Sequence, residues 1–188
     1  KLRILFVYPS PIFGETPLGL LYLSAVLKEE GHQTKLFDLT PYRRRWALHR
    51  YKEIKKDFLK EIHSFRPDLI AFSADSTQYS LAVELSRLVK QTVDIPIIFG
   101  GPHPTVDPES VIREKSIDMI CIGEGEHAIL DVVNNPERVS SIPNIWSKID
   151  GKIIRNPVRP LIEDLDSLPY PDRDILDKKI LLNEFNGA

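Results

Sequence analysis

The stretch Ile97-Ile-Phe-Gly-Gly-Pro-His-Pro-Thr-Val-Asp-Pro-Glu109 decides how the fold is interpreted. An apolar run stops at two glycines, and a rigid turn punctuated by prolines follows. In an open parallel sheet, a strand ends in this way where a ligand comes close to the backbone. A second apolar run, Asp118 to Ile122, ends in Gly123-Glu-Gly-Glu126. We therefore expect these two glycine-bearing ends to form neighbouring sides of one crevice.

Apolar segments of the same kind recur along the first two thirds of the chain. They are rich in β-branched and aromatic residues without alternation, which is typical of strands covered on both faces. Segments with helical spacing lie between them, and parallel strands require such crossovers. The sequence therefore predicts an α/β fold with a doubly wound, Rossmann-like sheet of five parallel strands and helices on both faces. The strands are expected at 3–8, 33–39, 68–73, 96–99 and 118–122, and the helices at 18–30, within 40–67, and at 80–93, 108–115 and from about 126.

The pattern changes after residue 136. Residues 144–155 predict a β-hairpin that turns at Asp150-Gly151, because Asp-Gly readily takes the positive φ angles of a two-residue primed turn. From Asn156 onward, prolines recur at 157, 160, 169 and 171, which is typical of an extended segment. We expect three parts: an α/β domain at 1–136, a hairpin extension at 137–160 and a linker at 161–188.

Composition narrows the function classes. The 188 residues are 42% hydrophobic, which is enough for a core, and the net charge of −2 indicates no polyanionic partner such as nucleic acid. No apolar run approaches the roughly 20 residues that span a bilayer, and the first residues lack the apolar core of a signal peptide. We therefore expect no membrane partner and a cytoplasmic location. The only cysteine, Cys121, allows neither a disulfide nor a cysteine-based metal cluster within this chain.

Four loops are expected at the carboxyl ends of the strands, where open α/β sheets bind ligands: 9–19, 73–78, 100–105 and 123–126. None contains G-x-G-x-x-G, and the chain has no G-x-x-x-x-G-K-[ST], which disfavours a dinucleotide or a triphosphate. The loops offer hydroxyl groups and bare backbone instead, and these suit a broad, partly apolar ligand. Each of these residues would serve equally well in an ordinary turn.

Three titratable residues in these loops could contact a ligand. His103 lies between two prolines with no second histidine or cysteine at ligand spacing, so we expect a turn element or a hydrogen-bond donor. Glu124 and Glu126 are two residues apart and would point the same way in an extended segment. Both are expected to contact a ligand, and Glu126 also to cap the following helix.

Together, these stretches resemble the N-terminal cobalamin-binding domain of the cobalamin-dependent radical S-adenosylmethionine proteins. The resemblance spans almost the whole chain, and the combination of motifs is specific. The matching pieces are Thr16-Pro-Leu-Gly-Leu20, Gly31-His32, Asp38, Pro67-Asp-Leu-Ile-Ala-Phe-Ser73, Gly100-Gly-Pro-His-Pro-Thr105, Pro108-Glu109, Gly123-Glu-Gly-Glu126 and Asp164-Leu-Asp-Ser-Leu-Pro-Tyr-Pro-Asp-Arg173.

The resemblance implies a cobalamin-binding module of a radical S-adenosylmethionine methyltransferase or cyclase. The family's catalytic half opens with C-x-x-x-C-x-x-C, whose cysteines hold a [4Fe-4S] cluster. This chain has one cysteine, so the cluster and S-adenosylmethionine would belong to a radical domain outside these residues, in the same full-length protein. Residues 161–188 would lead to that domain. We expect no catalysis by this chain alone and no catalytic residue in it.

One motif departs from other cobalamin domains. Those of the methionine synthase and mutase type carry D-x-H-x-x-G after the first strand, and its histidine binds cobalt. The corresponding loop here is Tyr8-Pro-Ser-Pro-Ile-Phe-Gly14, without histidine. We expect the corrin at the C-terminal edge of the sheet with no protein ligand to the metal. The lower cobalt face would meet Ser10 to Phe13, and the dimethylbenzimidazole tail would lie along strands three to five.

The resemblance assigns cofactor contacts to residues of all four loops. They are Pro9, Ser10, Pro11, Ile12, Phe13, Leu18, Gly19, Ser73, Ser76, Thr77, Gly100, Gly101, Pro102, His103, Thr105, Gly123, Glu124, Gly125 and Glu126.

Two other function classes fit the same architecture. A flavodoxin-like or receiver-like module would carry flavin or signal, but a receiver needs an acidic pair after the first strand and a lysine after the last. Tyr8-Pro-Ser10 and Gly123-Glu-Gly125 supply neither. A hydrolase using Glu124, Glu126 and His103 would lack a nucleophile or a set of metal ligands.

Overall fold

The computed structural model describes residues 1–10, 16–39 and 48–176, and Pro11, Ile12 and Phe13 lie outside this range. Its centre is one seven-stranded sheet in the order β2-β1-β3-β4-β5-β6-β7, of which the first five strands are parallel. The α/β fold class is therefore confirmed. The strands are β1 Arg3–Tyr8, β2 Gln33–Asp38, β3 Leu69–Ser73, β4 Ile97–Gly100, β5 Met119–Cys121, β6 Ile145–Ile149 and β7 Lys152–Arg155.

The sheet is larger than the predicted five strands because the hairpin joins it. β6 pairs antiparallel with β5, and β7 pairs with β6. The hairpin thereby covers the edge that β5 would otherwise leave with unpaired backbone groups. Asp150 and Gly151 take φ angles of 49° and 74°, which confirms the primed turn expected from Asp-Gly. The boundaries of the three predicted parts stay a prediction.

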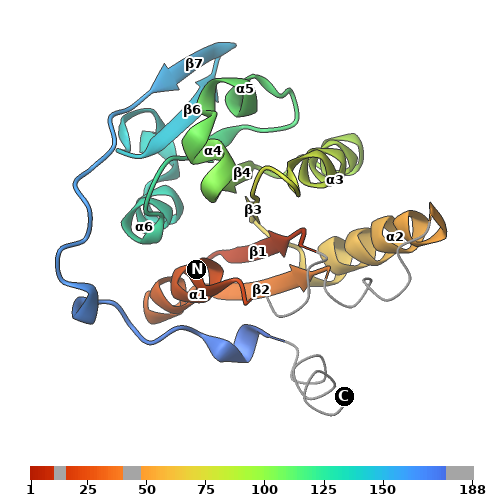
Figure 1. The fold of residues 1–188 in the computed structure, drawn as a ribbon, viewed down its shortest axis with the longest axis horizontal. Coiled ribbons are helices and arrows are strands. Elements are labelled where there is room, and N and C mark those ends of the chain that lie inside the picture. The colour runs from red at the N-terminus through yellow and green to blue at the C-terminus, as the bar shows by residue number, and fades with distance from the viewer. Residues whose placement is uncertain (11–15, 40–47, 177–188) are drawn as a thin grey trace.

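Helices cover both faces of the sheet (Figure 1). α1 (Leu18–Glu29) and α6 (Glu126–Asn134) pack on one face, and α2 (Leu48–Phe65), α3 (Tyr79–Thr92) and α5 (Pro108–Arg113) pack on the other. A short helix, α4 (Pro102–Val106), stands where the sequence indicated only a turn, because Pro102 fits a first helical turn. Three 3₁₀ helices complete the described part: η2 Pro136–Ser141, η3 Leu165–Ser167 and η4 Arg173–Ile175.

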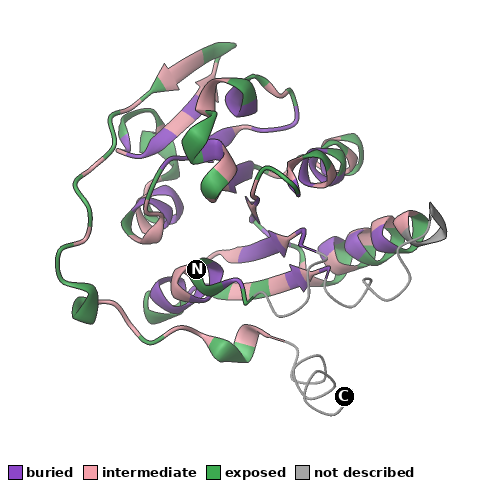
Figure 2. Ribbon diagram, in the orientation of Figure 1, coloured by how far each residue is buried: buried purple, intermediate pink, exposed green. Residues whose placement is uncertain are grey.

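The core consists of two apolar layers that share the sheet. On β1, Leu5 and Val7 face the α2 and α3 side, whereas Ile4 and Phe6 face the α1 and α6 side. All four side chains are fully buried, and the central strands are buried along most of their length in Figure 2. Burial on both faces explains why the strands show no polar alternation in the sequence.

After β7 the chain runs back past α6 to α1 and β2 (Figure 1). Asp172 fixes this segment: its carboxylate accepts hydrogen bonds from Ser24 Oγ and Lys28 Nζ, both at 2.5 Å, and its N–H donates to Leu21 O at 3.0 Å. Residues 156–176 therefore form a strap across the α1 and α6 side of the sheet. None of the helices within the described residues is long and apolar enough to cross a membrane.

Candidate functional site

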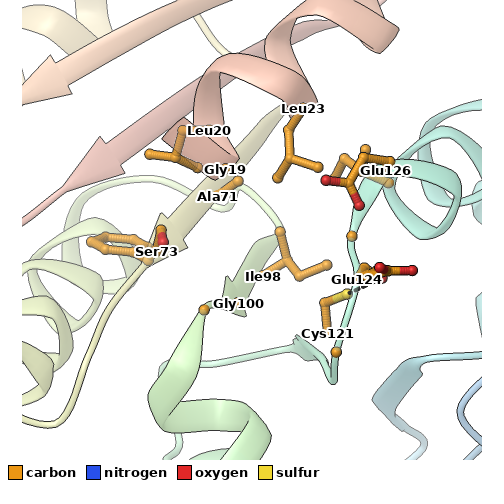
Figure 3. Close-up of a pocket in the computed structure, with 15 residues that line it drawn as sticks. Gly19, Leu20, Leu23, Ala71, Ser73, Ile98, Gly100, Cys121, Glu124 and Glu126 are labelled. Carbon is orange, nitrogen blue, oxygen red and sulfur yellow. Dashed lines mark hydrogen bonds between the residues drawn. The ribbon is translucent and has the colours of Figure 1, made fainter. Parts of the chain in front are cut away.

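A cavity lies at the carboxyl ends of β3, β4 and β5, beneath α1 and α6 (Figure 3). It exists because the sheet presents small side chains there, among them Ala71, Ser73, Gly100 and Cys121. Gly19 and Gly125 open its wall on the helix side. The full lining is Gly19, Leu20, Leu23, Ala71, Phe72, Ser73, Ile98, Gly100, Gly101, Cys121, Gly123, Glu124, Gly125, Glu126 and Ile129.

The cavity has a volume of about 180 Å³. Pockets that bury a whole drug-sized ligand measure roughly 300–1,000 Å³. The cavity is thus large enough for one ring system of a bigger molecule, and the rest of that molecule would lie over the strand ends.

Gly100 keeps the cavity open. It pairs in register with Ser73 on β3, and a Cβ atom placed on it would meet only Cys121 Cβ, at 3.9 Å. A small side chain would therefore fit without strain, whereas a large one would extend into the cavity.

Gly101 is required for a different reason. Its φ angle is 97°, and a Cβ atom would come within 3.0 Å of both Ala74 O and Ser73 Oγ. The end of β3 lies this close because of two backbone hydrogen bonds, both at 3.1 Å: Ala74 N–H donates to Gly100 O, and Ala74 O accepts from His103 N–H. The two glycines thus have separate roles, and the backbone conformation alone accounts for Gly101.

Thr105 joins two of the loops. Its hydroxyl donates to Gly101 O at 3.0 Å and accepts from Gly123 N–H at 3.1 Å. The loop after β4 and the loop after β5 are therefore fixed to each other, as expected for two sides of one crevice.

Asn144 holds the loop after β5 from beneath. It is buried and has a φ angle of 71°; its Nδ2 donates to Ile122 O at 2.7 Å, and its Oδ1 accepts from Arg159 N at 3.1 Å. Sequence reasoning placed this residue only at the start of the hairpin. Its role depends on the return of the strap to the sheet, which no local motif signals.

The two glutamates point in different directions, contrary to the expectation for an extended segment. Glu126 is the first residue of α6, so the backbone is already helical there. Glu124 Oε2 accepts the N–H of Ile162 in the strap at 2.7 Å, whereas Glu126 directs its carboxylate toward Leu23 of α1 (Figure 3). Glu126 Oε2 is buried and has no hydrogen-bond partner among the described residues.

Cys121 lies on the cavity floor as a buried free thiol. Burial, and next the negative charge of Glu126, raise the pKa of this thiol to about 12. The side chain therefore stays protonated near neutral pH and behaves as a small apolar group.

The sequence between residues 13 and 133 matches the family model of the B12 binding domain. The chain belongs to the B12-binding domain family. The resemblance inferred from the sequence is thereby confirmed at the level of the family, whose cofactor is cobalamin.

Curated relatives of this B12-binding domain are longer proteins. An uncharacterized methyltransferase of Pyrococcus horikoshii is 30% identical to this chain, in an alignment that covers 93% of this chain and 39% of that protein. The anaerobic magnesium-protoporphyrin IX monomethyl ester cyclase of Rubrivivax gelatinosus is 26% identical, over 94% of this chain and 33% of its own length. The chain thus spans about a third of the length of these relatives.

Solved structures share the fold of this B12-binding domain. The cobalamin-dependent S-adenosylmethionine radical enzyme OxsB, with aqua-cobalamin and S-adenosylmethionine bound, superimposes with a TM-score of 0.74 at 22% identity, over 93% of this chain and 24% of that one. The radical S-adenosylmethionine methyltransferase TsrM from Kitasatospora setae, with cobalamin and a [4Fe-4S] cluster bound, gives 0.70 at 18% identity, over 90% and 31%.

The structure of the B12-binding domain gathers part of the predicted contact set around the cavity. Those lining it are Gly19, Ser73, Gly100, Gly101, Gly123, Glu124, Gly125 and Glu126. The other described members lie outside the lining: Pro9, Ser10, Leu18, Ser76, Thr77, Pro102, His103 and Thr105. The role of each in cofactor binding stays a prediction.

His103 lies in a small polar cluster next to the cavity. Its Nδ1 is 3.0 Å from Ser76 Oγ, and its ring packs against Tyr79 with the centroids 4.2 Å apart. Asp75 Oδ1 accepts hydrogen bonds from the backbone N–H and the hydroxyl of Thr77. Burial raises the pKa of Asp75, but these hydrogen bonds outweigh burial, so the pKa lies below its ordinary value. In the part of the chain that the structure describes, no three His, Cys, Asp or Glu side chains form a group that could hold a metal ion.

The apolar lining was missed by sequence reasoning about the site, although a signal existed. Ala71 and Ile98 precede Ser73 and Gly100 by two residues, so the two-residue period of a strand places each pair on one face. The other missed members are Leu20, Leu23, Phe72, Cys121 and Ile129.

A second cavity, of about 310 Å³, opens at the amino ends of the strands. Its lining includes Lys90 and Asp118, whose side chains form an ion pair at 2.7 Å. It also includes Ser147, which is buried and whose hydroxyl has no hydrogen-bond partner among the described residues. Ligands of open α/β sheets bind at the opposite, carboxyl edge. The cavity under α1 and α6 lies at that carboxyl edge.

Proposed function

We propose that this chain holds cobalamin at the carboxyl edge of its sheet, with the dimethylbenzimidazole base in the cavity between β3–β5 and α1–α6. The observation that carries the proposal is the opening made by Gly100 together with Ser73 and Cys121. A bicyclic aromatic base is a flat, mostly apolar group, and the floor and walls of the cavity are mostly apolar. The unpartnered Glu126 oxygen offers a polar contact at its edge.

We further propose that no protein histidine binds the cobalt. The residues that the structure describes in the cavity lining include no histidine, and His103 is engaged with Ser76 and Tyr79 beside it. With its base in the cavity, the cofactor would have no nitrogen ligand on the lower face. Bound cobalamin supplies a cobalt ion that can carry a methyl group, and the residues of this chain bind it and exclude water from its base.

The larger protein is proposed to be a radical S-adenosylmethionine methyltransferase or cyclase. The support is the family membership together with relatives named as a methyltransferase and a cyclase, of which this chain covers about a third. In this proposal residues 1–136 hold the cofactor, 137–160 extend the sheet, and 161–188 lead to a radical domain in the same chain.

Retention of hydroxocobalamin tests the function. The purified chain is incubated with the corrinoid and passed through a gel-filtration column, and the corrin absorbance in the protein peak is measured. We expect about one corrinoid per chain. A parallel run with flavin mononucleotide tests the flavodoxin-like alternative, and retained flavin without retained corrinoid would reject the proposal.

A further inference from the structure

Glu126 contributes an unusual group to the cavity. Its Oε2 is buried and has no hydrogen-bond partner in the described residues, although a buried charged oxygen costs free energy when it is unpaired. The neighbouring wall is apolar, formed by Leu20, Leu23 and Ile129. This oxygen is therefore placed to receive a donor from whatever fills the cavity.

Two charged neighbours of the cavity make hydrogen bonds to other parts of the chain. Glu124 is bonded to Ile162 N–H, and its carboxylate turns away from the cavity in Figure 3. Arg159, from the strap, donates through Nη2 to Asp131 Oδ2 at 2.9 Å, while its Nε is buried and has no partner among the described residues.

Two further neighbours are not placed to exchange a proton with a ligand in the cavity. The Cys121 thiol keeps its proton because of its high pKa, and His127 is exposed to solvent. Among the described residues, the cavity lining from α1, β3 and β4 contains no titratable side chain. Glu126 is thus the one carboxylate of the described lining with a buried oxygen that has no hydrogen-bond partner.

The base that we place in the cavity has one basic ring nitrogen, which is free when it does not bind cobalt. A neutral ring nitrogen and an ionised carboxylate are both acceptors, so each would leave the other unsatisfied in an apolar cavity. One added proton removes this conflict, because either partner can then donate to the other.

Resting on the proposed function, we propose that Glu126 shares one proton with the ring nitrogen of the cobalamin base. Binding would then take up one proton from water. That proton would lie between the Glu126 carboxylate and the ring nitrogen of the base, whose electron pair is the one that can bond cobalt. The cobalt–nitrogen bond would break with both bonding electrons staying on nitrogen, so the step needs no oxidant or reductant. The domain would thereby select corrinoids whose lower base is a basic heterocycle.

Proton uptake is measured by isothermal titration calorimetry at one pH in two buffers of different ionisation enthalpy. Methylcobalamin is the probe, because its cobalt carries no titrating water molecule. We expect one proton per bound corrinoid for the wild-type chain, and an affinity that falls about tenfold per pH unit as pH rises above neutral. Cobinamide, which lacks the nucleotide base, should bind without proton uptake.

Two variants distinguish the effect of Glu126 on proton uptake from the effect of the neighbouring carboxylate. Glu126→Gln should bind methylcobalamin with no proton uptake and little pH dependence, since an amide can donate to a neutral ring nitrogen without an added proton. Glu124→Gln makes the same change in charge at the neighbouring carboxylate and should keep the uptake of one proton, whatever its affinity.

The outcomes distinguish this inference from the function on which it rests. Methylcobalamin binding without proton uptake, or the same uptake in Glu126→Gln, would overturn the role of Glu126 and leave cobalamin binding intact. A corrin spectrum showing the base still on cobalt would do the same. Failure of the wild-type chain to bind either corrinoid would remove both proposals.

Discussion

Ser73 and Gly100 lie opposite each other at the carboxyl ends of β3 and β4, and together they leave the sheet bare where α1 and α6 cross above it. The strands run side by side up to this pair, and the next residue, Gly101, turns sharply away with a φ angle of 97°. The cavity of this B12-binding domain therefore depends on two neighbouring glycines with different requirements: open space at Gly100 and backbone conformation at Gly101.

The two glycines should respond oppositely to alanine. Gly101→Ala forces a side chain into a positive φ angle against the Ala74 carbonyl, and we expect a loss of about 1–3 kcal/mol in the free energy of unfolding. Gly100→Ala has room and should stabilise the chain by about 0.5–1 kcal/mol, through lower entropy of the unfolded state. Urea unfolding of both variants measures this, and equal effects would contradict the assignment.

Asn144 should be a stability determinant of the loop after β5. Asn144→Ala leaves Ile122 O and Arg159 N without their partner and places alanine at a φ angle of 71°, so we expect a loss of about 1–3 kcal/mol. Asn144→Gly removes the same hydrogen bonds but suits the positive φ angle, and it should cost less. If glycine proved as costly as alanine in thermal unfolding, backbone conformation would play no part.

Cys121 should react slowly with thiol reagents. With a pKa of about 12, the Cys121 thiol is almost wholly protonated at pH 8, whereas roughly a quarter of free cysteine side chains are ionised. We expect the rate of modification by a disulfide reagent to be at least about a hundredfold below that of free cysteine, and to fall further with hydroxocobalamin. A rate that the corrinoid leaves unchanged would argue against a ligand over the cavity floor.

Asp172 should make attachment of the strap depend on pH. Burial opposes its ionisation, but hydrogen bonds from Lys28 and Ser24 outweigh burial and lower its pKa in the folded chain. A depressed pKa stabilises the fold above the unfolded value of about 3.9, and this stability is lost as pH falls through the folded pKa. Hydrogen exchange of residues 160–176 should therefore be slower in the wild type than in Asp172→Asn at pH 7. The two should converge in acid, once the pH falls below the lowered pKa of Asp172 in the folded chain, and a constant difference would contradict this role.

The parallel sheet was predictable because its signals are local. The apolar strands, the helices between them and the Asp150-Gly151 turn each follow from short-range spacing, and each lies close to where it was expected. Attachment of the hairpin to β5 was not predictable in this way, since pairing between 119–121 and 145–147 depends on tertiary contacts. The same holds for the strap, whose contacts with Ser24 and Lys28 span more than 140 residues.

The candidate site was predictable in its loops and less so in its details. The glycine-bearing strand ends do meet, and Thr105 bonds them together. The opposite directions of Glu124 and Glu126 could not be inferred, because they depend on where α6 begins and on Ile162 arriving from the strap. The need for glycine at position 101 likewise arises from Ala74, which lies on another strand end.

Binding of cobalamin in the cavity that Gly100 keeps open can be tested by titrating four chains with hydroxocobalamin. Corrin absorbance gives the dissociation constant and the stoichiometry for the wild type, Gly100→Ala, Gly100→Leu and Ser147→Val, where the last places a branched apolar side chain in the other cavity. We expect one saturable site in the wild type and in Ser147→Val, near-normal affinity in Gly100→Ala, and at least a hundredfold weaker binding in Gly100→Leu. Equal affinity of wild type and Gly100→Leu, or no saturable binding by the wild type, would contradict it.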